Sequence, residues 1–282
     1  MNKSSFKEIK LKARKKIKGH FGEAFLAFLV IPFIFSLGNS AIGGALNNYA
    51  IISYIFQFFF TVLISYITII MALKFAKGDY DNLFKKMVNS KEGYINLAIF
   101  TAIMTVLSLL PFSFYYSFFE DFTNYLINIP PYYNPTATEF FTDISAFLPS
   151  RELMITSFFV EIFVLVITVR MFFAQYLIID KNMKAFDAIK TSWKYSKGNF
   201  LRIALFPFSF FLWYLLFFIT CGLIVIYLIP YMIVSYVMFY NSILRENGEE
   251  VIDEVEPIHF IEEDEIADPL AEDKDPFDDL LK

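Results

Sequence analysis

Six apolar segments, each long enough to cross a lipid bilayer, dominate this chain of 282 residues. A membrane helix needs roughly 20 mostly apolar residues, because about 1.5 Å of rise per residue must cover about 30 Å of hydrocarbon. The segments that meet this requirement are approximately 24–46, 49–73, 94–117, 153–179, 199–220 and 223–244. We therefore expect an all-α, polytopic membrane protein with six transmembrane helices.

The composition favours lipid as the medium around much of the chain. Hydrophobic residues make up 57% of the sequence, and 37 Phe with 17 Tyr supply more apolar bulk than one globular core would hide. Cys221 is the single cysteine, which excludes an internal disulfide and any metal site built from several thiolates. The two histidines, His20 and His259, lie far apart in the sequence without a catalytic partner beside them. We expect no catalytic, metal-binding or cofactor-binding residues and no cofactor.

Lysine and arginine gather in alternate connections between the apolar segments. Residues 3–18 contain eight of them, residues 74–91 contain five lysines and residues 181–197 contain another five. The connections between these are poor in basic residues, and the expected outer loop 118–152 has only Arg151. Because Lys and Arg beside membrane helices stay on the cytoplasmic side, this pattern predicts a multi-pass plasma-membrane protein with both termini in the cytoplasm.

The same pattern divides the chain into three parts. We expect residues 1–20 to form a basic amphipathic cytoplasmic helix and residues 21–245 to form the six-helix membrane domain. Residues 246–282 should form an acidic, disordered cytoplasmic tail. Within the membrane domain, two stretches near 79–90 and 183–196 repeat apolar residues every three or four positions. Such spacing places the apolar side chains on one helix face, so we expect two interfacial amphipathic helices there.

A short motif recurs before three of the apolar segments. A lysine and a glycine precede an aromatic residue each time, and the residues concerned are Lys18 with Gly19, Lys91 with Gly93, and Lys197 with Gly198, with Trp193 one turn before the last pair. One interpretation is a threefold repeat, in which each helical hairpin follows an interfacial helix. The other is that any multi-span protein carries basic, aromatic-flanked cytoplasmic loops.

Four polar residues inside the apolar segments are candidates for an intramembrane site. Glu161 and Arg170 lie in the fourth segment, nine residues apart, which puts them on opposite helix faces and excludes a direct pair. Charged groups in hydrocarbon are costly, so each has either a binding or relay role or a structural one. Gln175 and Gln57 are weaker candidates, because a neutral amide more often bonds a neighbouring helix.

The two ends of the chain carry opposite charge. Residues 1–245 contain 22 Lys and Arg against 13 Asp and Glu, whereas 246–282 contain 2 against 16. The basic part should adhere to anionic lipids of the cytoplasmic leaflet, and the acidic tail disfavours nucleic acid as a partner. Within the tail, Phe277, Leu280 and Leu281 form an apolar motif suited to docking on a basic groove of a cytosolic protein, unless the tail only solvates the chain.

Several short motifs form a recognisable series along the chain. They are Ile9-Lys10-Leu11-Lys12-Ala13-Arg14 and Lys18-Gly19, then Ala185-Phe186-Asp187-Ala188-Ile189-Lys190-Thr191-Ser192, Lys197-Gly198-Asn199-Phe200, Trp213, Cys221-Gly222, Pro230-Tyr231 and Phe239-Tyr240. This series resembles the bacterial membrane protein family called domain of unknown function 975, over most of residues 5–244. The resemblance implies a six-helix fold with short amphipathic helices, and no established reaction. More distantly, that family resembles the membrane domain of some glycerophosphodiester phosphodiesterases, whose soluble catalytic domain this chain lacks.

Two functions fit these observations better than an intramembrane enzyme does. The first is a non-enzymatic protein of the bacterial cell envelope that organises lipids or partner proteins through its interfacial helices and tail. The alternative is a transporter or lipid-translocating protein with a polar seam near Glu161 and Arg170. Transport requires both charged residues to face one central cavity, whereas the organising role predicts charges at the edges of a closed bundle.

Overall fold

The computed structural model describes residues 3–46, 48–85, 90–128, 136, 150–249 and 251, all of which belong to the compact unit Met1–Ile252. Helices account for most of these residues, and no strand occurs among them. Six helical segments are long and apolar enough to cross a membrane: Phe21–Ala45, Ala50–Lys77, Lys91–Ser113, Arg151–Asp180, Phe200–Ile219 and Val225–Glu246. The structure thus confirms the predicted all-α class and its six candidate membrane helices.

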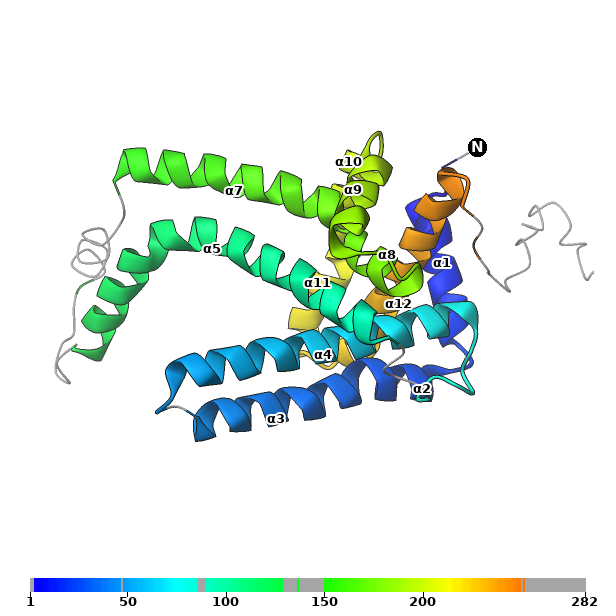
Figure 1. Cartoon of the computed structure of the whole chain (residues 1–282), viewed down its shortest axis with the longest axis horizontal. Helices are drawn as coiled ribbons and strands as arrows, with labels where there is room; N and C mark the ends of the chain where they lie inside the picture. Colours follow the sequence, from blue (N-terminus) through cyan, green and yellow to red (C-terminus); the bar gives the residue numbers. More distant parts are fainter. Residues whose placement is uncertain are drawn as a thin grey trace, which may run out of the picture. The chain divides into compact units, whose positions relative to one another are not determined.

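Figure 1 shows the helices in their order along the chain. In order they are α1 (Phe6–Ile17), α2 (Phe21–Phe25), the π-helical turn η1 (Leu26–Val30), α3 (Ile31–Ala45), α4 (Ala50–Lys77), α5 (Lys91–Ile127), α7 (Arg151–Met171), α8 (Ala174–Asp180), α9 (Ala185–Ser196), α10 (Phe200–Leu205), the 3-10 turn η2 (Pro207–Phe210), α11 (Phe211–Ile219) and α12 (Val225–Glu246). Serine side chains cap three of these helices, since the hydroxyls of Ser5, Ser90 and Ser150 accept from backbone N–H groups three residues later.

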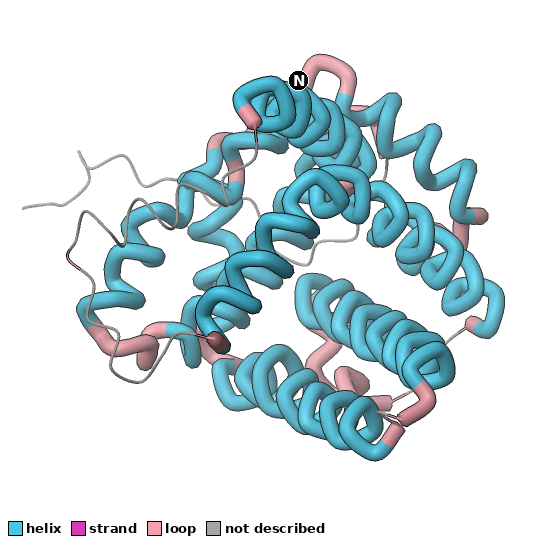
Figure 2. The backbone as a smooth tube through the Cα atoms, turned by 90° about the vertical axis from the view of Figure 1, so that its left-hand side faces the viewer, coloured by secondary structure: helices cyan, strands magenta, loops and turns pink. Residues whose placement is uncertain are grey.

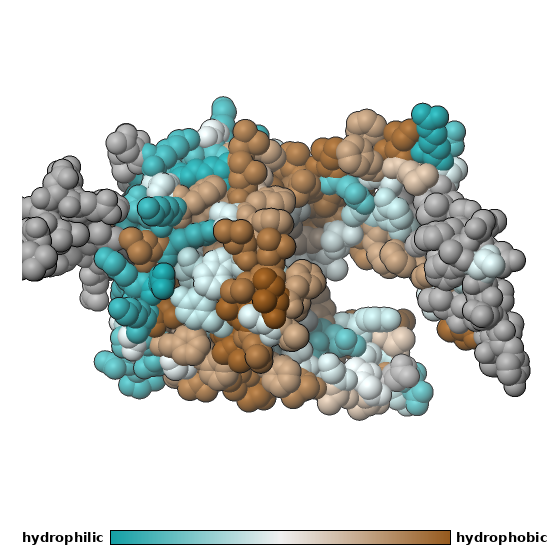
Figure 3. All heavy atoms as spheres, turned by 180° about the vertical axis from the view of Figure 1, so that it is seen from behind, coloured by the Kyte–Doolittle hydropathy of each residue, from teal (hydrophilic) through white to brown (hydrophobic). Residues whose placement is uncertain are grey.

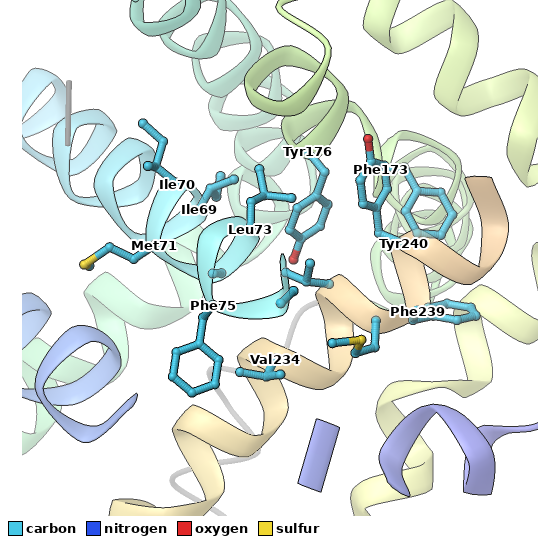
Figure 4. Packing of buried hydrophobic residues seen from close by; sticks show 14 of the residues in the cluster. Ile69, Ile70, Met71, Leu73, Phe75, Phe173, Tyr176, Val234, Phe239 and Tyr240 are labelled. Atoms are coloured by element: carbon cyan, nitrogen blue, oxygen red, sulfur yellow. The ribbon is translucent and has the colours of Figure 1, made fainter. Parts of the chain in front are cut away.

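Buried residues concentrate in one region, which we call the hub. It comprises α1, residues 67–77 of α4, α8, α9 and α12. In the close-up of Figure 4, Phe75 of α4 lies near Val234 of α12, and Tyr176 of α8 lies near Tyr240. These last two rings stack with centroids 5.3 Å apart. The hub is therefore a packed protein core made from segments far apart in the sequence.

Two pairs of long helices extend from the hub, and we call them the arms. The first arm is α3 with residues 50–66 of α4, and the second is α5 with α7 (Figure 1). Large apolar side chains cover their outsides, and Ile51 and Phe159 are 76% and 64% exposed. Figure 2 views the arms from their free ends and shows helices joined by loops. Figure 3 shows hydrophobic residues across the middle of one face and hydrophilic residues at the hub end.

The apolar face predicted for the N-terminal helix is buried against protein. Ile9, Ala13 and Ile17 are at most 2% exposed, because α1 packs along α12 rather than on lipid. Aromatic contacts fix the direction of this pairing. The ring centroids of Phe6 and Phe239 lie 6.2 Å apart toward the end of α12. Near the beginning of α12, the rings of Phe21 and Tyr227 stack with centroids 6.1 Å apart.

That last stack also changes the expected arrangement of the helices. In a simple up-and-down bundle, Phe21 and Tyr227 would lie near opposite membrane surfaces, because Phe21 begins the first span and Tyr227 lies just after the short turn between the fifth and sixth spans. The structure places their rings side by side. Accordingly, α12 crosses the arms at the hub instead of running alongside them (Figure 1).

Three predicted boundaries differ from the structure. Residues 79–85 form turns instead of the interfacial helix expected near 79–90, and 86–89 lie outside the described residues. The predicted outer loop 118–152 begins inside α5, which continues to Ile127 past Pro111. The acidic tail predicted from 246 begins in ordered structure, since Glu246 ends α12 and Glu249 forms an ion pair with Lys181.

Candidate functional site

The junction between α7 and α8 is where the structure gathers predicted site residues. The helix breaks at Phe172 and Phe173, which frees backbone groups that a continuous helix would pair. The hydroxyl of Ser192 replaces both partners: it donates to the carbonyl of Arg170 at 2.7 Å and accepts from the N–H of Phe173 at 3.2 Å. This bridge holds α9 against the end of α7.

The bridge places two aromatic rings beside the guanidinium of Arg170. Its central carbon lies 5.0 Å from the ring centre of Trp193 and 5.6 Å from that of Phe200. These are cation–π distances. No carboxylate oxygen in the described part of the chain lies within 4.0 Å of this guanidinium. Trp193 is 44% exposed, so the site opens to the surroundings, and we call Arg170, Trp193 and Phe200 the arginine site.

Polar contacts with α5 also fix the position of α9. The side-chain oxygen of Asn96 accepts from the N–H of Ala185 at 3.1 Å and so caps the beginning of α9. Nearby, the hydroxyl of Ser90 donates to the side-chain oxygen of Asn182 at 3.3 Å. Because α9 is tied to α5 at its beginning and, through Ser192, to α7 near its end, Trp193 is held in place over Arg170.

Ion pairs and a hydrogen bond join the ends of α4, α8 and α12 to one another and to α10. Lys77 pairs with Asp180 at 2.8 Å, and the hydroxyl of Tyr240 donates to the other oxygen of Asp180 at 3.2 Å. Arg202 binds both carboxylate oxygens of Glu246, at 2.6 and 2.8 Å. The same guanidinium donates to the carbonyl of Ser4. Through Arg202, these contacts connect Ser4 near the beginning of the described chain and Glu246 near its end to the fifth candidate span, Phe200–Ile219.

Glu249 forms a smaller cluster with Tyr195 and Lys181. The tyrosine hydroxyl donates to one carboxylate oxygen at 2.8 Å, and the Lys181 ammonium lies 3.2 Å from the other. These donors hold the pKa of Glu249 below its ordinary value. Burial, followed by the carboxylate nearby, raises the pKa of Tyr195 to about 12. At neutral pH the pair is therefore a neutral phenol donating to a carboxylate.

Gln175 lines a cavity of about 310 Å³ between α4, α5, α7 and α8. The polar side chains on its wall are all uncharged: besides the Gln175 amide, they are the hydroxyls of Ser65, Thr101 and Thr168. The remaining wall is apolar and includes Phe100 and Met104. This cavity offers hydrogen bonds and apolar contact to a neutral molecule or group, without an ion-pair partner.

The other two polar candidates lie elsewhere. Glu161 is exposed on the outer surface of α7, nine residues before Arg170, and it lines none of the cavities described here. The amide of Gln57 donates to the hydroxyl of Ser53 at 2.8 Å, and it packs where a side chain on Gly43 would meet it at 3.1 Å. Gln57 thus closes the α3–α4 contact, as expected for a neutral amide between helices.

The three glycines of the recurring motif differ in backbone conformation and in surroundings. Gly198 has φ of 82°, a left-handed conformation that other residues adopt only with strain. Gly93 lies within α5, where an added Cβ would contact the ring of Tyr66 at 3.5 Å, while no atom lies within 4 Å of one added at Gly19. Lys18, Lys91 and Lys197 are all exposed. The motif therefore does not repeat one backbone conformation.

Sequence analysis did not identify Ser192, Tyr195 or Asp180 as site residues. Their side chains act across helices, and a single sequence does not show which helices meet. The partial signal for Ser192 was its place on the predicted amphipathic helix, beside Trp193 and on the face that turns out to be buried. The docking residues Phe277, Leu280 and Leu281 lie outside the described residues. In the described part of the chain, no group of three His, Cys, Asp or Glu residues is placed to hold a metal ion.

Six helices long and apolar enough to cross a membrane, arranged around a buried hub, are the features of a polytopic α-helical membrane protein. A family model described as "Protein of unknown function (DUF975)" matches residues 1–247, and the chain belongs to that family. No curated protein matches the chain, and no solved structure matches it. These comparisons do not extend the resemblance to glycerophosphodiester phosphodiesterases.

Proposed function

We propose that the protein is a non-enzymatic integral membrane protein of the bacterial cell envelope that organises membrane lipids or partner proteins, with both termini in the cytoplasm. The observation that carries this proposal is the arginine site. Arg170 presents a guanidinium beside Trp193 and Phe200, at the end of α7 within the candidate span Arg151–Asp180, and without a carboxylate within ion-pair distance among the described residues. Such a group is suited to the phosphate of a lipid headgroup.

Two physical properties support a lipid headgroup as the ligand. A guanidinium offers paired N–H donors that match phosphate oxygens, and it keeps its charge at every physiological pH. Tryptophan is favoured at the boundary between hydrocarbon and headgroups, because its ring is apolar and its N–H is a donor. Trp193 beside Arg170 combines both at the end of α7.

The positions of the charged residues favour organisation over transport through a charged seam. Arg170 lies at the end of α7 next to the hub, whereas Glu161 lies exposed nine residues earlier in the same helix, and neither residue lines a described cavity. A transport pathway built on both residues would need them on one continuous surface. Their separation matches the alternative in which charges lie at the edges of the bundle.

The experiment compares two arginine variants by native mass spectrometry of the full-length protein in detergent. Arg170→Gln should weaken binding of phosphatidylglycerol about fivefold, as expected for one cation beside an anionic lipid. Arg151→Gln removes the same charge from the beginning of α7, far from the arginine site, and should bind as wild type does. Equal binding by Arg170→Gln and wild type would remove the basis of the proposal.

A second candidate function is lipid translocation, which the Gln175 cavity favours. Hydroxyl and amide groups in a cavity between candidate spans offer a passing headgroup hydrogen bonds within the membrane. Gln175→Leu should then slow the exchange of fluorescent phospholipid between leaflets of vesicles containing the protein. Gln57→Leu, an equivalent change between α3 and α4, serves as the control. If vesicles containing the wild-type protein exchange lipid no faster than vesicles without protein, this function is rejected.

A further inference from the structure

A second cavity with a different chemistry lies where the N-terminal helix meets the first candidate span. It has a volume of about 330 Å³ and is lined by Arg14, Ile17 and Lys18 from the end of α1 and the adjoining turn, Phe21 from α2, and Tyr227 from α12. Sequence analysis expected the basic N-terminal part, including Arg14 and Lys18, to adhere to anionic lipids in general, and gave Phe21 and Tyr227 no role. The cavity is separate from the arginine site and shares no residue with it.

The polar part of this cavity carries two positive charges. Arg14 and Lys18 are four residues apart, so they lie on the same side of the helix and its adjoining turn. Both are exposed, and neither takes part in an ion pair within the described chain. Lys12 of the same helix, by contrast, pairs with Glu8 at 3.4 Å. Two uncompensated cations that share a concave site attract an anion.

The remaining walls are aromatic and aliphatic. The rings of Phe21 and Tyr227 stack at 6.1 Å, and Tyr227 stacks in turn on Trp213 at 5.7 Å. Ile17 is 1% exposed and forms the base beside them. Phe21 is also the first residue of the candidate span Phe21–Ala45. The cavity thus joins a cationic surface to the beginning of an apolar one.

An apolar cavity lies between the same two segments. It measures about 670 Å³, and its walls include Phe28, Leu29 and Phe33 from the first span with Leu223, Ile226 and Ile229 from around the beginning of α12. No charged side chain lines it. Along α2 and α3, the cationic cavity is followed by the apolar one, so a molecule with an anionic head and an apolar chain would meet a complementary surface for each part.

We propose that Arg14 and Lys18 bind the phosphate of an anionic glycerophospholipid, whose acyl chains follow the apolar surface between α3 and the beginning of α12. The proposal rests on the proposed lipid-organising function and adds to it a second site and a class of ligand. The aromatic walls and the adjoining apolar cavity favour a lipid over free phosphate, which has no apolar part to place there.

The test measures lipid binding to the full-length protein by native mass spectrometry, with phosphatidylglycerol and phosphatidylcholine of equal chain length as probes. Arg14→Gln with Lys18→Gln should weaken phosphatidylglycerol binding about 25-fold, at about 1 kcal/mol for each cation. Lys7→Gln with Lys15→Gln removes the same charge from exposed positions of α1 outside the cavity, and should leave binding at the wild-type level. Phosphatidylcholine should bind wild type more weakly than phosphatidylglycerol does.

Three outcomes would overturn the assignment. They are unchanged binding in the Arg14/Lys18 variant, equal binding of the two lipids, and displacement of phosphatidylglycerol by equimolar inorganic phosphate, which would identify free phosphate as the ligand. If the double variant does not fold, as judged by its thermal unfolding, Lys18→Gln alone replaces it. Loss of lipid in Arg170→Gln together with full binding in the Arg14/Lys18 variant would reject this site while leaving the proposed function intact.

Discussion

The hub and the arms of this protein both contain apolar candidate spans but bury them very differently. In the window that defines each candidate span, 67% of residues are buried inside the protein for α12, against 17% for the part of α5 in the second arm. The hub pairs its apolar surface with protein, and the arms leave theirs to the surrounding medium. Hydrophobicity alone therefore marks which residues avoid water, whereas the packing partner decides what each residue contributes to stability.

The largest expected effect is the loss of stability when a phenylalanine is replaced by alanine, which should be much greater in the hub than in the arms. Phe239 in the hub is fully buried and stacks on Phe206 at 4.4 Å, whereas Phe159 in the second arm is 64% exposed. Phe239→Ala should lower the free energy of unfolding by about 3–5 kcal/mol, because it leaves a cavity. Phe159→Ala should lower it by less than about 1 kcal/mol. Chemical unfolding in one detergent measures both, and similar losses would mean that the distinction between hub and arms has no energetic basis.

A smaller effect tests how the second arm is joined to the hub. Ser192→Ala removes the hydroxyl that bonds the Arg170 carbonyl and the Phe173 N–H, and it should cost about 1–3 kcal/mol because buried backbone groups lose their partner. Ser196 is equally buried on α9, and among the described residues its hydroxyl bonds the Trp193 carbonyl of its own helix and no group of another helix. Ser196→Ala is thus the matched control and should cost less. Hydrogen exchange at the Phe173 amide should accelerate in Ser192→Ala alone, and unchanged exchange would refute this role.

The smallest expected effect concerns pH at the edge of the hub. The folded pKa of Glu249 lies below its ordinary value of 4.5, so its stabilising contribution is present above pH 4.5 and is lost as the pH falls through the folded pKa. Wild type should therefore lose more stability than Glu249→Gln on acidification from pH 7. Tyr195→Phe keeps the carboxylate but removes its donor, and it should give an intermediate slope. Identical slopes for all three proteins would show that the cluster contributes nothing to folding.

Much of the fold was predictable because its signals are local. The segment predicted at 24–46 corresponds to Phe21–Ala45, and the one at 223–244 to Val225–Glu246. The helix expected near 183–196 is α9, Ala185–Ser196. Length, hydropathy and helical spacing are properties of neighbouring residues, so one sequence contains them.

The partners of these helices were not predictable in the same way. Periodicity identified the apolar face of α1 correctly, but it gave no sign that α12, and not lipid, would cover Ile9 and Ile17. At the arginine site, sequence analysis selected Arg170 and Trp193 separately. Their contact depends on the helix break at Phe172 and on the hydroxyl of Ser192, which are decided by tertiary packing.

The pairing of α1 with α12 has a consequence for the order in which the protein is made. Ile17 ends the first helix and Val225 begins the last, so about 200 residues are synthesised before the partner of α1 exists. At about 5–20 residues per second, the ribosome takes roughly 10–40 s over that interval. During this time the nascent helix carries an uncovered apolar stripe next to a row of lysines. The bilayer surface or a chaperone is then its temporary neighbour, and completion of the final helix is the step that closes the core.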